Sequence, residues 1–308
     1  MVHADTQTGA AHKTGGAMTG GVWAAVLRFL SYGPQGGGPR ISIFRHPVMV
    51  RITHWVNAGI IIIMFMSGLQ IFNAHPALYW GSGSNFDAPA LSMTGFMENG
   101  EPKGVTQIGN WKFDTTGVLG ASKVDGVWNA RGFPDWMTLP GPQWLAMGRL
   151  WHFFFAWLFV INAAAFVIYA AWRGHLRALV PRWLDIKHLP REIADHARLR
   201  FARGAKAREY NALQKLTYFI VIFVLGPLIV LTGLTMSPTM AAALHPLLWM
   251  FGGRQSARTI HFICAFSFFG FFIVHIIMVV LSGTWNNLRS MITGHYEIET
   301  GKAGGDHG

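Results

Sequence analysis

The chain has 308 residues, of which 51% are hydrophobic and 13% are charged. Soluble domains carry about a quarter of charged residues, so this composition argues against a soluble protein. The formal net charge of +11 is concentrated beside apolar stretches, where it is a signal of membrane topology and requires no nucleic-acid partner. The single cysteine, Cys264, excludes both an intrachain disulfide framework and a CxxCH motif.

The first 40 residues are rich in Gly, Ala and Thr, which predicts a flexible extension. Within this extension, Val22 to Leu30 is apolar but too short to cross a bilayer, and we expect an interfacial helix there. The Gly-rich piece from Gly33 to Gly38 is expected to be a linker.

Four apolar stretches are long enough to span a membrane. Trp and Tyr residues near their ends are typical of membrane interfaces. The pattern predicts an all-α integral membrane protein, a bundle of four transmembrane helices within a domain of residues 41–296, followed by a flexible C-terminal tail, 297–308. The expected spans are about 52–73, 150–172, 216–236 and 259–281.

Basic residues give the predicted orientation. Residues 173–215 contain 11 Lys and Arg against 4 Asp and Glu, and the first 51 residues contain 5 against 1. The loop 74–148 contains 4 basic against 6 acidic residues. By the positive-inside rule both termini and the basic segment are cytoplasmic, and the loop lies outside. We therefore expect a multi-pass protein of the bacterial inner membrane.

The outer loop is too long for a simple connection, so we expect it to be structured. Met97 to Gly104 reads as a turn between two short strands. The loop also carries five tryptophans, which indicate either a docking face or packing of the loop on its own membrane surface. On the inner side, Leu189 to Ala207 has helical spacing and a cationic face that predicts contact with anionic lipid or with a cytoplasmic subunit.

Four histidines lie inside the apolar stretches, where a buried imidazole is costly without a partner or a task. His261 and His275 are 14 residues apart, which is a rise of about 21 Å on one helix and a return to nearly the same face. His152 lies at the depth of His261, and His54 at the depth of His275. These two pairs predict two b haems, one near each membrane surface.

A metal or proton pathway is the alternative for the same histidines, and a hydrogen bond to a backbone carbonyl or Ser is the alternative for any one of them. The four stretches contain no Asp or Glu, and carriers of metals or protons usually need carboxylates. Sites with two axial histidines leave no open position for dioxygen, which favours electron transfer.

Arginine precedes three of these histidines by three residues, and this spacing places both side chains on one helix face. Arg51, Arg149 and Arg258 are each nearer the membrane surface, where haem propionates would emerge and pair with guanidinium. Snorkelling to the interface is the alternative explanation. Small residues recur at Ser67-Gly68-Leu69 and Thr232-Gly233-Leu234, and they indicate close approach of a porphyrin or a helix.

At these residues the chain resembles the di-haem cytochrome b subunits of formate dehydrogenases, nickel-iron hydrogenases and thiosulfate reductases. The resemblance runs roughly from Phe44 to Tyr296, and its most specific motif is the 15-residue piece that joins the two histidines of the fourth stretch. The matching pieces are RITHWVNA, GRLWHF, YNALQK, LTGL and HFICAFSFFGFFIVH.

The resemblance implies the same haem ligands, His54, His152, His261 and His275. It also implies a quinone site beside the inner haem, with Asn211 and Gln214 as its polar residues. Leu213 stands where related proteins often have Gly, so the shape of that pocket departs from the family pattern. Helix capping and interface solvation are the alternative roles of the two amides.

The sequence thus predicts an electron-transfer subunit that links an outer-side molybdopterin, iron-sulfur or nickel-iron subunit to the quinone pool. The residues indicate no substrate chemistry of the chain's own apart from quinone. A self-contained di-haem quinone oxidoreductase for a small outer-side reductant and a histidine-lined metal or proton transporter are the alternatives.

Overall fold

A computed structural model describes residues 16–32, 40–174, 176–198 and 212–299. The chain forms two compact units. The smaller unit combines residues 1–46, 194–209 and 275–308, and the larger combines residues 47–193 and 210–274. The expected linker at 33–38, the second half of the cationic segment 189–207 (residues 199–207) and most of the C-terminal tail lie outside the described residues.

The smaller unit contains α1 (Gly16–Tyr32), a two-stranded antiparallel sheet of β1 (Arg40–Phe44) and β8 (His295–Glu299), and the end of the long helix α10. Helix α1 includes the apolar piece for which an interfacial helix was expected. The start of the tail predicted to be flexible is instead part of β8, where Glu297 pairs with Arg289 at 2.6 Å.

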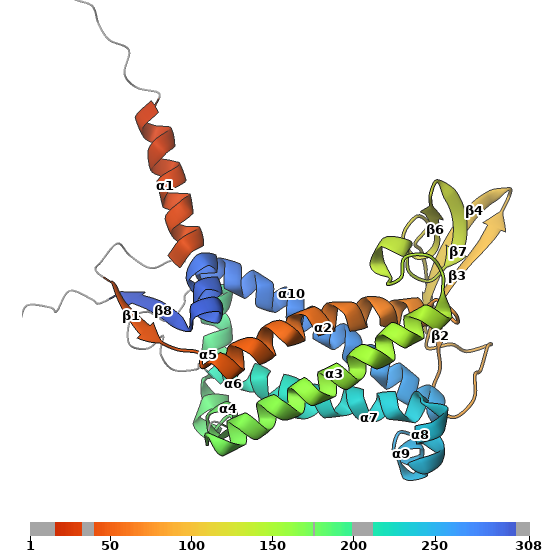
Figure 1. Ribbon diagram of the computed structural model, residues 1–308. Coiled ribbons are helices and arrows are strands. Elements are labelled where there is room, and N and C mark those ends of the chain that lie inside the picture. The colour runs from red at the N-terminus through yellow and green to blue at the C-terminus, as the bar shows by residue number, and fades with distance from the viewer. Residues whose placement is uncertain (1–15, 33–39, 175, 199–211, 300–308) are drawn as a thin grey trace, which may run out of the picture. The chain divides into compact units, whose positions relative to one another are not determined.

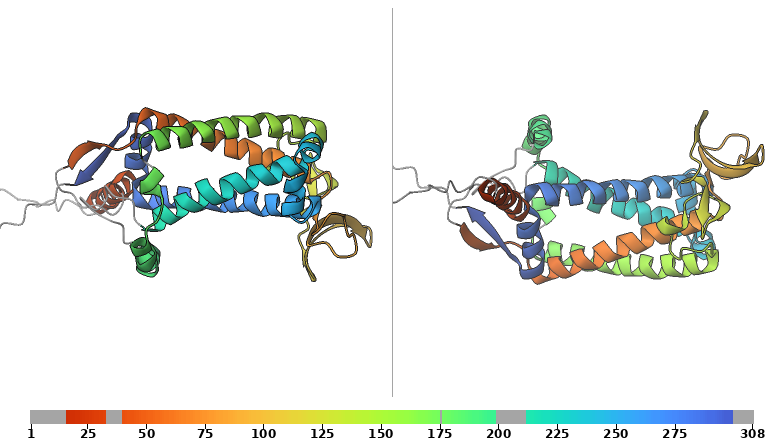
Figure 2. Two further views of the ribbon diagram at one scale, coloured as in Figure 1. Left: turned by 90° about the horizontal axis from the view of Figure 1, so that it is seen from below. Right: turned by 90° about the horizontal axis from the view of Figure 1, so that it is seen from above.

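The larger unit is built around helices that are long and apolar enough to cross a membrane. Four such helices occur among the described residues, and each includes one of the expected spans almost completely, with longer bounds. Figures 1 and 2 show α2, α3, α7 and the first part of α10 lying side by side. The four are α2 (Val48–Phe72), α3 (Leu145–Trp172), the run from α6 to α7 (Ala212–Met236) and α10 (Arg254–Thr293).

Phenylalanines hold α2 against α10. Phe65 stacks on Phe269 with ring centroids 4.5 Å apart and meets Phe266 edge-on at 5.2 Å. Further along, Phe72 contacts Phe262 at 4.9 Å. Aromatic pairs in these geometries contribute about 0.5–1.5 kcal/mol each beyond the apolar area that they bury.

Polar and small residues hold α2 against α3. The Asn162 side-chain amide donates to the Thr53 carbonyl at 2.9 Å and to Asn57 Oδ1 at 2.7 Å. A Cβ added at Gly148 would lie 2.8 Å from Gln70 Cγ, so glycine permits the close approach of these helices. Close approach at small residues and interhelical hydrogen bonds are typical of membrane helices.

The third span is not a regular α-helix along its whole length. It begins as α6 (Ala212–Phe219), continues as the π-helical segment η3 (Ile220–Leu225) and ends as α7 (Gly226–Met236). Pro227 at the start of α7 lacks the N–H that a regular helix would use here. The changed hydrogen-bond pattern beside it follows from that missing donor.

The connection from α2 to α3 forms strands, so the all-α expectation is not confirmed. One sheet has the order β2-β3-β4-β5, and a hairpin, β6-β7, forms a second. The expected hairpin is present, because β3 and β4 pair through Glu98 and Glu101 across Asn99-Gly100. The strands are β2 (Ala77–Leu78), β3 (Leu91–Glu98), β4 (Glu101–Ile108), β5 (Trp111–Asp114), β6 (Gly120–Val124) and β7 (Val127–Arg131).

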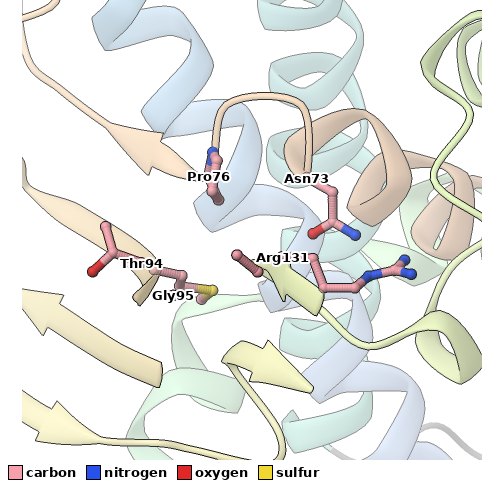
Figure 3. A pocket seen from close by; sticks show the side chains of 7 residues that line it. Asn73, Pro76, Thr94, Gly95 and Arg131 are labelled. Carbon is pink, nitrogen blue, oxygen red and sulfur yellow. The ribbon is translucent and has the colours of Figure 1, made fainter. Parts of the chain in front are cut away.

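Asn73, which caps the C-terminus of α2, fastens this connection to the helix. Its side-chain amide donates to the Phe133 carbonyl at 3.0 Å, and the Phe133 N–H donates back to Asn73 Oδ1 at 2.7 Å. A pocket of about 220 Å³ lies beside this pair. Arg131 and Asn73 both line this pocket (Figure 3), and the Arg131 guanidinium donates to the carbonyls of Phe133 and Gly141. The polar groups at the pocket therefore organise the connection itself.

Short helices complete the larger unit. Between the second and third spans, α4 (Leu176–Leu179) is followed by α5 (Trp183–Ala197), which ends in the smaller unit. Between the third and fourth spans lie α8 (Pro238–Ala243) and α9 (His245–Met250). Both helices are short and mostly apolar, which is typical of segments that lie at a membrane interface.

We predict that Asn73→Ala loosens the α2–α3 connection while the bundle remains folded. The substitution removes both hydrogen bonds to Phe133 and leaves the Phe133 N–H without a partner, at a cost of about 1–3 kcal/mol, while the Phe133 carbonyl still accepts from Arg131. Hydrogen exchange at the Phe133 amide, measured in lipid nanodiscs, should accelerate roughly tenfold or more. Asn129→Ala is the matched control, because the Asn129 amide bonds only to the nearby Val127 carbonyl. Equal exchange in the two variants would contradict the assigned role.

Candidate haem site

Two of the four predicted histidines meet inside the bundle. His152 of α3 and His261 of α10 have ring centroids 6.2 Å apart, with ring planes at 65°. Both residues belong to the larger unit. The structure therefore confirms that α3 and α10 bring these two imidazoles together, as their matched depths predicted.

Each imidazole is held by a neighbouring helix through its Nδ1 atom. His152 Nδ1 lies 3.1 Å from the Met64 carbonyl and 3.1 Å from Ser67 Oγ, and both of these partners belong to α2. A carbonyl oxygen only accepts hydrogen bonds, so the proton of the neutral ring must be on Nδ1. The Nε2 lone pair of His152 is then available to coordinate a metal.

His261 repeats this arrangement on the other side of the pair. Its Nδ1 lies 3.0 Å from the Ile229 carbonyl and 3.1 Å from Thr232 Oγ1, both on α7. The same argument places its proton on Nδ1 and leaves the Nε2 lone pair available to coordinate a metal.

Glycine follows each hydroxyl residue and makes space for the imidazole. A Cβ added at Gly68 would lie 3.3 Å from His152 Cε1, and a Cβ added at Gly233 would lie 3.4 Å from His261 Cε1. The separation at Gly68 is tighter than an ordinary contact and the one at Gly233 is at its lower limit, so glycine allows each ring to lie directly against the backbone of the facing helix. The two small-residue motifs of the sequence therefore serve ring packing.

The residues fit a haem with two axial histidines. A metal–imidazole bond is about 2 Å long and the ring centre lies about 1 Å further, so two axial imidazoles place their ring centres about 6 Å apart. The observed 6.2 Å agrees with that spacing. Nδ1–H groups that donate to backbone carbonyls are the usual outer partners of metal-bound histidine.

The other two predicted ligands, His54 and His275, belong to different compact units. His54 lies on α2 in the larger unit, where its ring meets Trp55 edge-on at 5.3 Å. His275 lies on α10, 14 residues beyond His261 in the same helix, and belongs to the smaller unit. The pairing of His54 with His275 therefore stays a prediction.

The arginines predicted to meet propionates have different surroundings. Arg258 donates to the backbone carbonyls of His75 and Ala77, at 2.6 and 3.0 Å. Arg149 is exposed, and its guanidinium lies 5.6 Å from the centre of the Phe153 ring. Arg51 lies on α2, three residues before His54. Contact of any of the three with a propionate stays a prediction, and Arg258 has a further structural role.

The sequence did not reveal that role, which is to fasten the α2–α3 connection to the start of α10. Beside Arg258, the Thr259 hydroxyl donates to the Tyr79 carbonyl at 2.6 Å, and Ser256 Oγ accepts from the Gly81 N–H at 2.7 Å. Burial and the charge of Arg258 lower the pKa of His75. His75 therefore stays neutral while it hydrogen-bonds the Tyr79 hydroxyl at 3.2 Å.

Of the two predicted quinone residues, Asn211 lies outside the described residues, and Gln214 lies in the first turn of α6. The next residue, Lys215, pairs with Asp185 of α5 at 3.1 Å. The hydrogen bond from the Arg182 N–H, together with Lys215, lowers the pKa of Asp185. The ionised carboxylate thus holds α5 beside the start of the third span.

Four membrane-capable helices and an imidazole pair with free Nε2 positions define the class of membrane cytochromes. The chain belongs to the prokaryotic cytochrome b561 family, whose family model matches residues 45–294. It is a haem-containing, multi-pass membrane subunit for electron transfer.

The chain is similar to YedZ1 of Azospira oryzae, a protein whose name describes a candidate subunit of a protein-methionine-sulfoxide reductase. The two are 25% identical over 252 residues, which cover 81% of this chain and 96% of the relative. No solved structure matches the chain.

We predict that Gly68→Leu displaces the His152 ring and lowers the haem content. A side chain at this position begins 3.3 Å from His152 Cε1, and a leucine would need the space that the ring occupies. Gly59→Leu is the control on the same helix, because no atom lies within 4 Å of a Cβ added there. The measurement is haem per purified chain by pyridine haemochrome. Equal haem content in both variants would show that the close approach is unimportant.

Proposed function

We propose that the chain binds two b haems and carries electrons between an outer-side oxidoreductase partner and the quinone pool. His152 with His261, and His54 with His275, are the proposed axial ligands. The observation that supports this proposal most strongly is the 6.2 Å spacing of His152 and His261, with both protons on Nδ1. The 14-residue separation of His261 and His275 on one helix supports a second site about 21 Å deeper.

Bound haem b supplies a one-electron iron couple. The residues of the chain would restrict its chemistry, because two histidine ligands would leave the iron no free position for dioxygen or another ligand. The backbone carbonyls of Met64 and Ile229 hold the imidazoles in one tautomer. Rigidly held ligands change little between oxidation states, which suits electron transfer.

A separate catalytic partner is supported by the α2–α3 connection and by the relative. The five tryptophans of the connection are all exposed, among them Trp111 at 70% and Trp136 at 71%. Exposed aromatic side chains are enriched where proteins bind one another. The name of the relative describes a subunit of a reductase. A molybdopterin, iron-sulfur or nickel-iron protein is the proposed partner on this surface.

The proposed location is the bacterial inner membrane, with the α2–α3 connection outside and both termini in the cytoplasm. The basic residues between the second and third spans support this orientation. The proposed quinone site is then on the inner side, near Asn211 and Gln214, where a polar group meets the edge of the bilayer. Anionic lipid is the proposed contact of the cationic inner segment.

Two haems per chain are expected, and His261→Ala should remove one of them. The deeper pair is about 21 Å away along α10, so the second haem should be retained. The measurement is a pyridine haemochrome assay with a reduced-minus-oxidised spectrum of the wild type and the variant. One haem per wild-type chain, or loss of both from the variant, would refute the four-ligand assignment.

The double variant Asn211→Leu/Gln214→Leu should slow haem oxidation by quinone while both haems are retained. Losing one or two hydrogen bonds to a quinone carbonyl costs about 1–3 kcal/mol, which corresponds to roughly a tenfold slower step. Stopped-flow oxidation of the reduced protein by a soluble quinone measures this step. Thr217→Val is the control, because the Thr217 hydroxyl donates to the Leu213 carbonyl of its own helix. An unchanged rate in the double variant would place the quinone elsewhere.

A further inference from the structure

The helices α2 and α7 present the same hydrogen-bonding group to the two facing histidines. In each helix a carbonyl is followed three residues later by a hydroxyl residue and then by glycine: Met64, Ser67 and Gly68 in α2, and Ile229, Thr232 and Gly233 in α7. Each carbonyl and each hydroxyl oxygen lies within 3.1 Å of one imidazole Nδ1. Packing of small residues alone would not require a hydroxyl at this point in both helices.

The hydroxyls are completely buried, since Ser67 and Thr232 are both 0% exposed. Each donates its own proton within its helix. Thr232 Oγ1 donates to the Leu228 carbonyl at 2.7 Å, and Ser67 Oγ lies 3.2 Å from the Met64 carbonyl. Because the hydroxyl proton is used there, the oxygen lone pairs face the imidazole and accept from Nδ1–H.

We propose that Ser67 and Thr232 are positioning residues that set the orientation and the electron donation of His152 and His261, and thereby the reduction potential of the outer haem. This proposal rests on the proposed ligand role of these histidines. An acceptor at Nδ1–H makes the imidazole a more basic ligand, which favours ferric iron over ferrous iron. The two hydroxyls therefore hold the outer haem at a lower potential than the carbonyls alone would.

The two hydroxyls differ in the carbonyl that accepts their proton, and this difference predicts which of the two substitutions has the larger effect on the reduction potential. Thr232 Oγ1 lies 2.7 Å from the Leu228 carbonyl, which takes no part in binding His261, and 3.2 Å from the Ile229 carbonyl, which does, so its proton is directed mainly to Leu228. Ser67 directs its proton to the Met64 carbonyl, which also accepts from His152. Removing the Ser67 hydroxyl thus releases the Met64 carbonyl to accept more strongly, which compensates in part. Removing the Thr232 hydroxyl should therefore change the reduction potential of the outer haem more than removing the Ser67 hydroxyl does.

The test compares Ser67→Ala and Thr232→Val with the wild type in a spectroscopic redox titration. The outer haem is the component that His261→Ala removes. At a fixed ambient potential, each variant should raise the ratio of reduced to oxidised outer haem by about 2- to 10-fold, more in Thr232→Val, and leave the inner haem unchanged. The low-spin electron paramagnetic resonance signal of the outer haem should shift as well, because ring orientation changes.

Two further variants separate this role from a general structural one. Thr232→Ser retains the hydroxyl and should restore the wild-type ratio. Ser267→Ala removes a hydroxyl of α10 that donates only to the Ile263 carbonyl, and it should change nothing. If Thr232→Val loses the outer haem but Thr232→Ser keeps it, the positioning role is supported. Loss in both variants would overturn it.

An unchanged ratio with both haems bound, or an equal shift in Ser267→Ala, would also overturn the positioning role. The ligand assignment is tested separately by His261→Ala. If that variant keeps every haem of the wild type, the proposed function fails. If His261→Ala loses one haem while the hydroxyl variants behave as the wild type, only the role of Ser67 and Thr232 fails.

Discussion

An imidazole inside an apolar bundle is stable only if its N–H group finds an acceptor, and the arrangement of the helices follows from this requirement. In this protein the acceptors are backbone carbonyls on the helix that faces each histidine. A helical carbonyl is reachable because its neighbours, Gly68 and Gly233, have no side chain in the way. The same contact fixes the tautomer, so that Nε2 is the nitrogen available to coordinate a metal. Helix packing and ligand orientation are thus one feature of the structure.

Much of this arrangement could be predicted from the sequence. The spans were evident because about 20 apolar residues are needed to cross a bilayer, and the structure extends them by a few residues where Pro47 and Gly253 border the helices. The meeting of His152 and His261 followed from matched depths. Depth alone does not specify hydrogen-bond partners, so the roles of Met64 and Ile229 could not be predicted, since any residue supplies the same carbonyl.

The connection between α2 and α3 was the least predictable part. Its Asn-Gly turn is a strong local signal, and the hairpin at Met97–Gly104 was predicted from it. The contacts of Arg258 depend on residues about 180 positions apart, for which a single sequence has no signal. Arg258 illustrates the difficulty. Its spacing from His261 predicted a haem propionate as its partner, whereas the fold gives it the carbonyls of His75 and Ala77.

The hydrogen bonds of the two histidines also bear on how the protein is made. The acceptors of His152 lie on α2, the span before it, and the acceptors of His261 lie on α7, the span before α10. Each histidine therefore finds its acceptor within its own helical hairpin, and no unsatisfied N–H group has to face lipid when a hairpin enters the bilayer. The two hairpins can be inserted one after the other during synthesis, and a group bound between His152 and His261 would then join two halves that are already stable in the membrane.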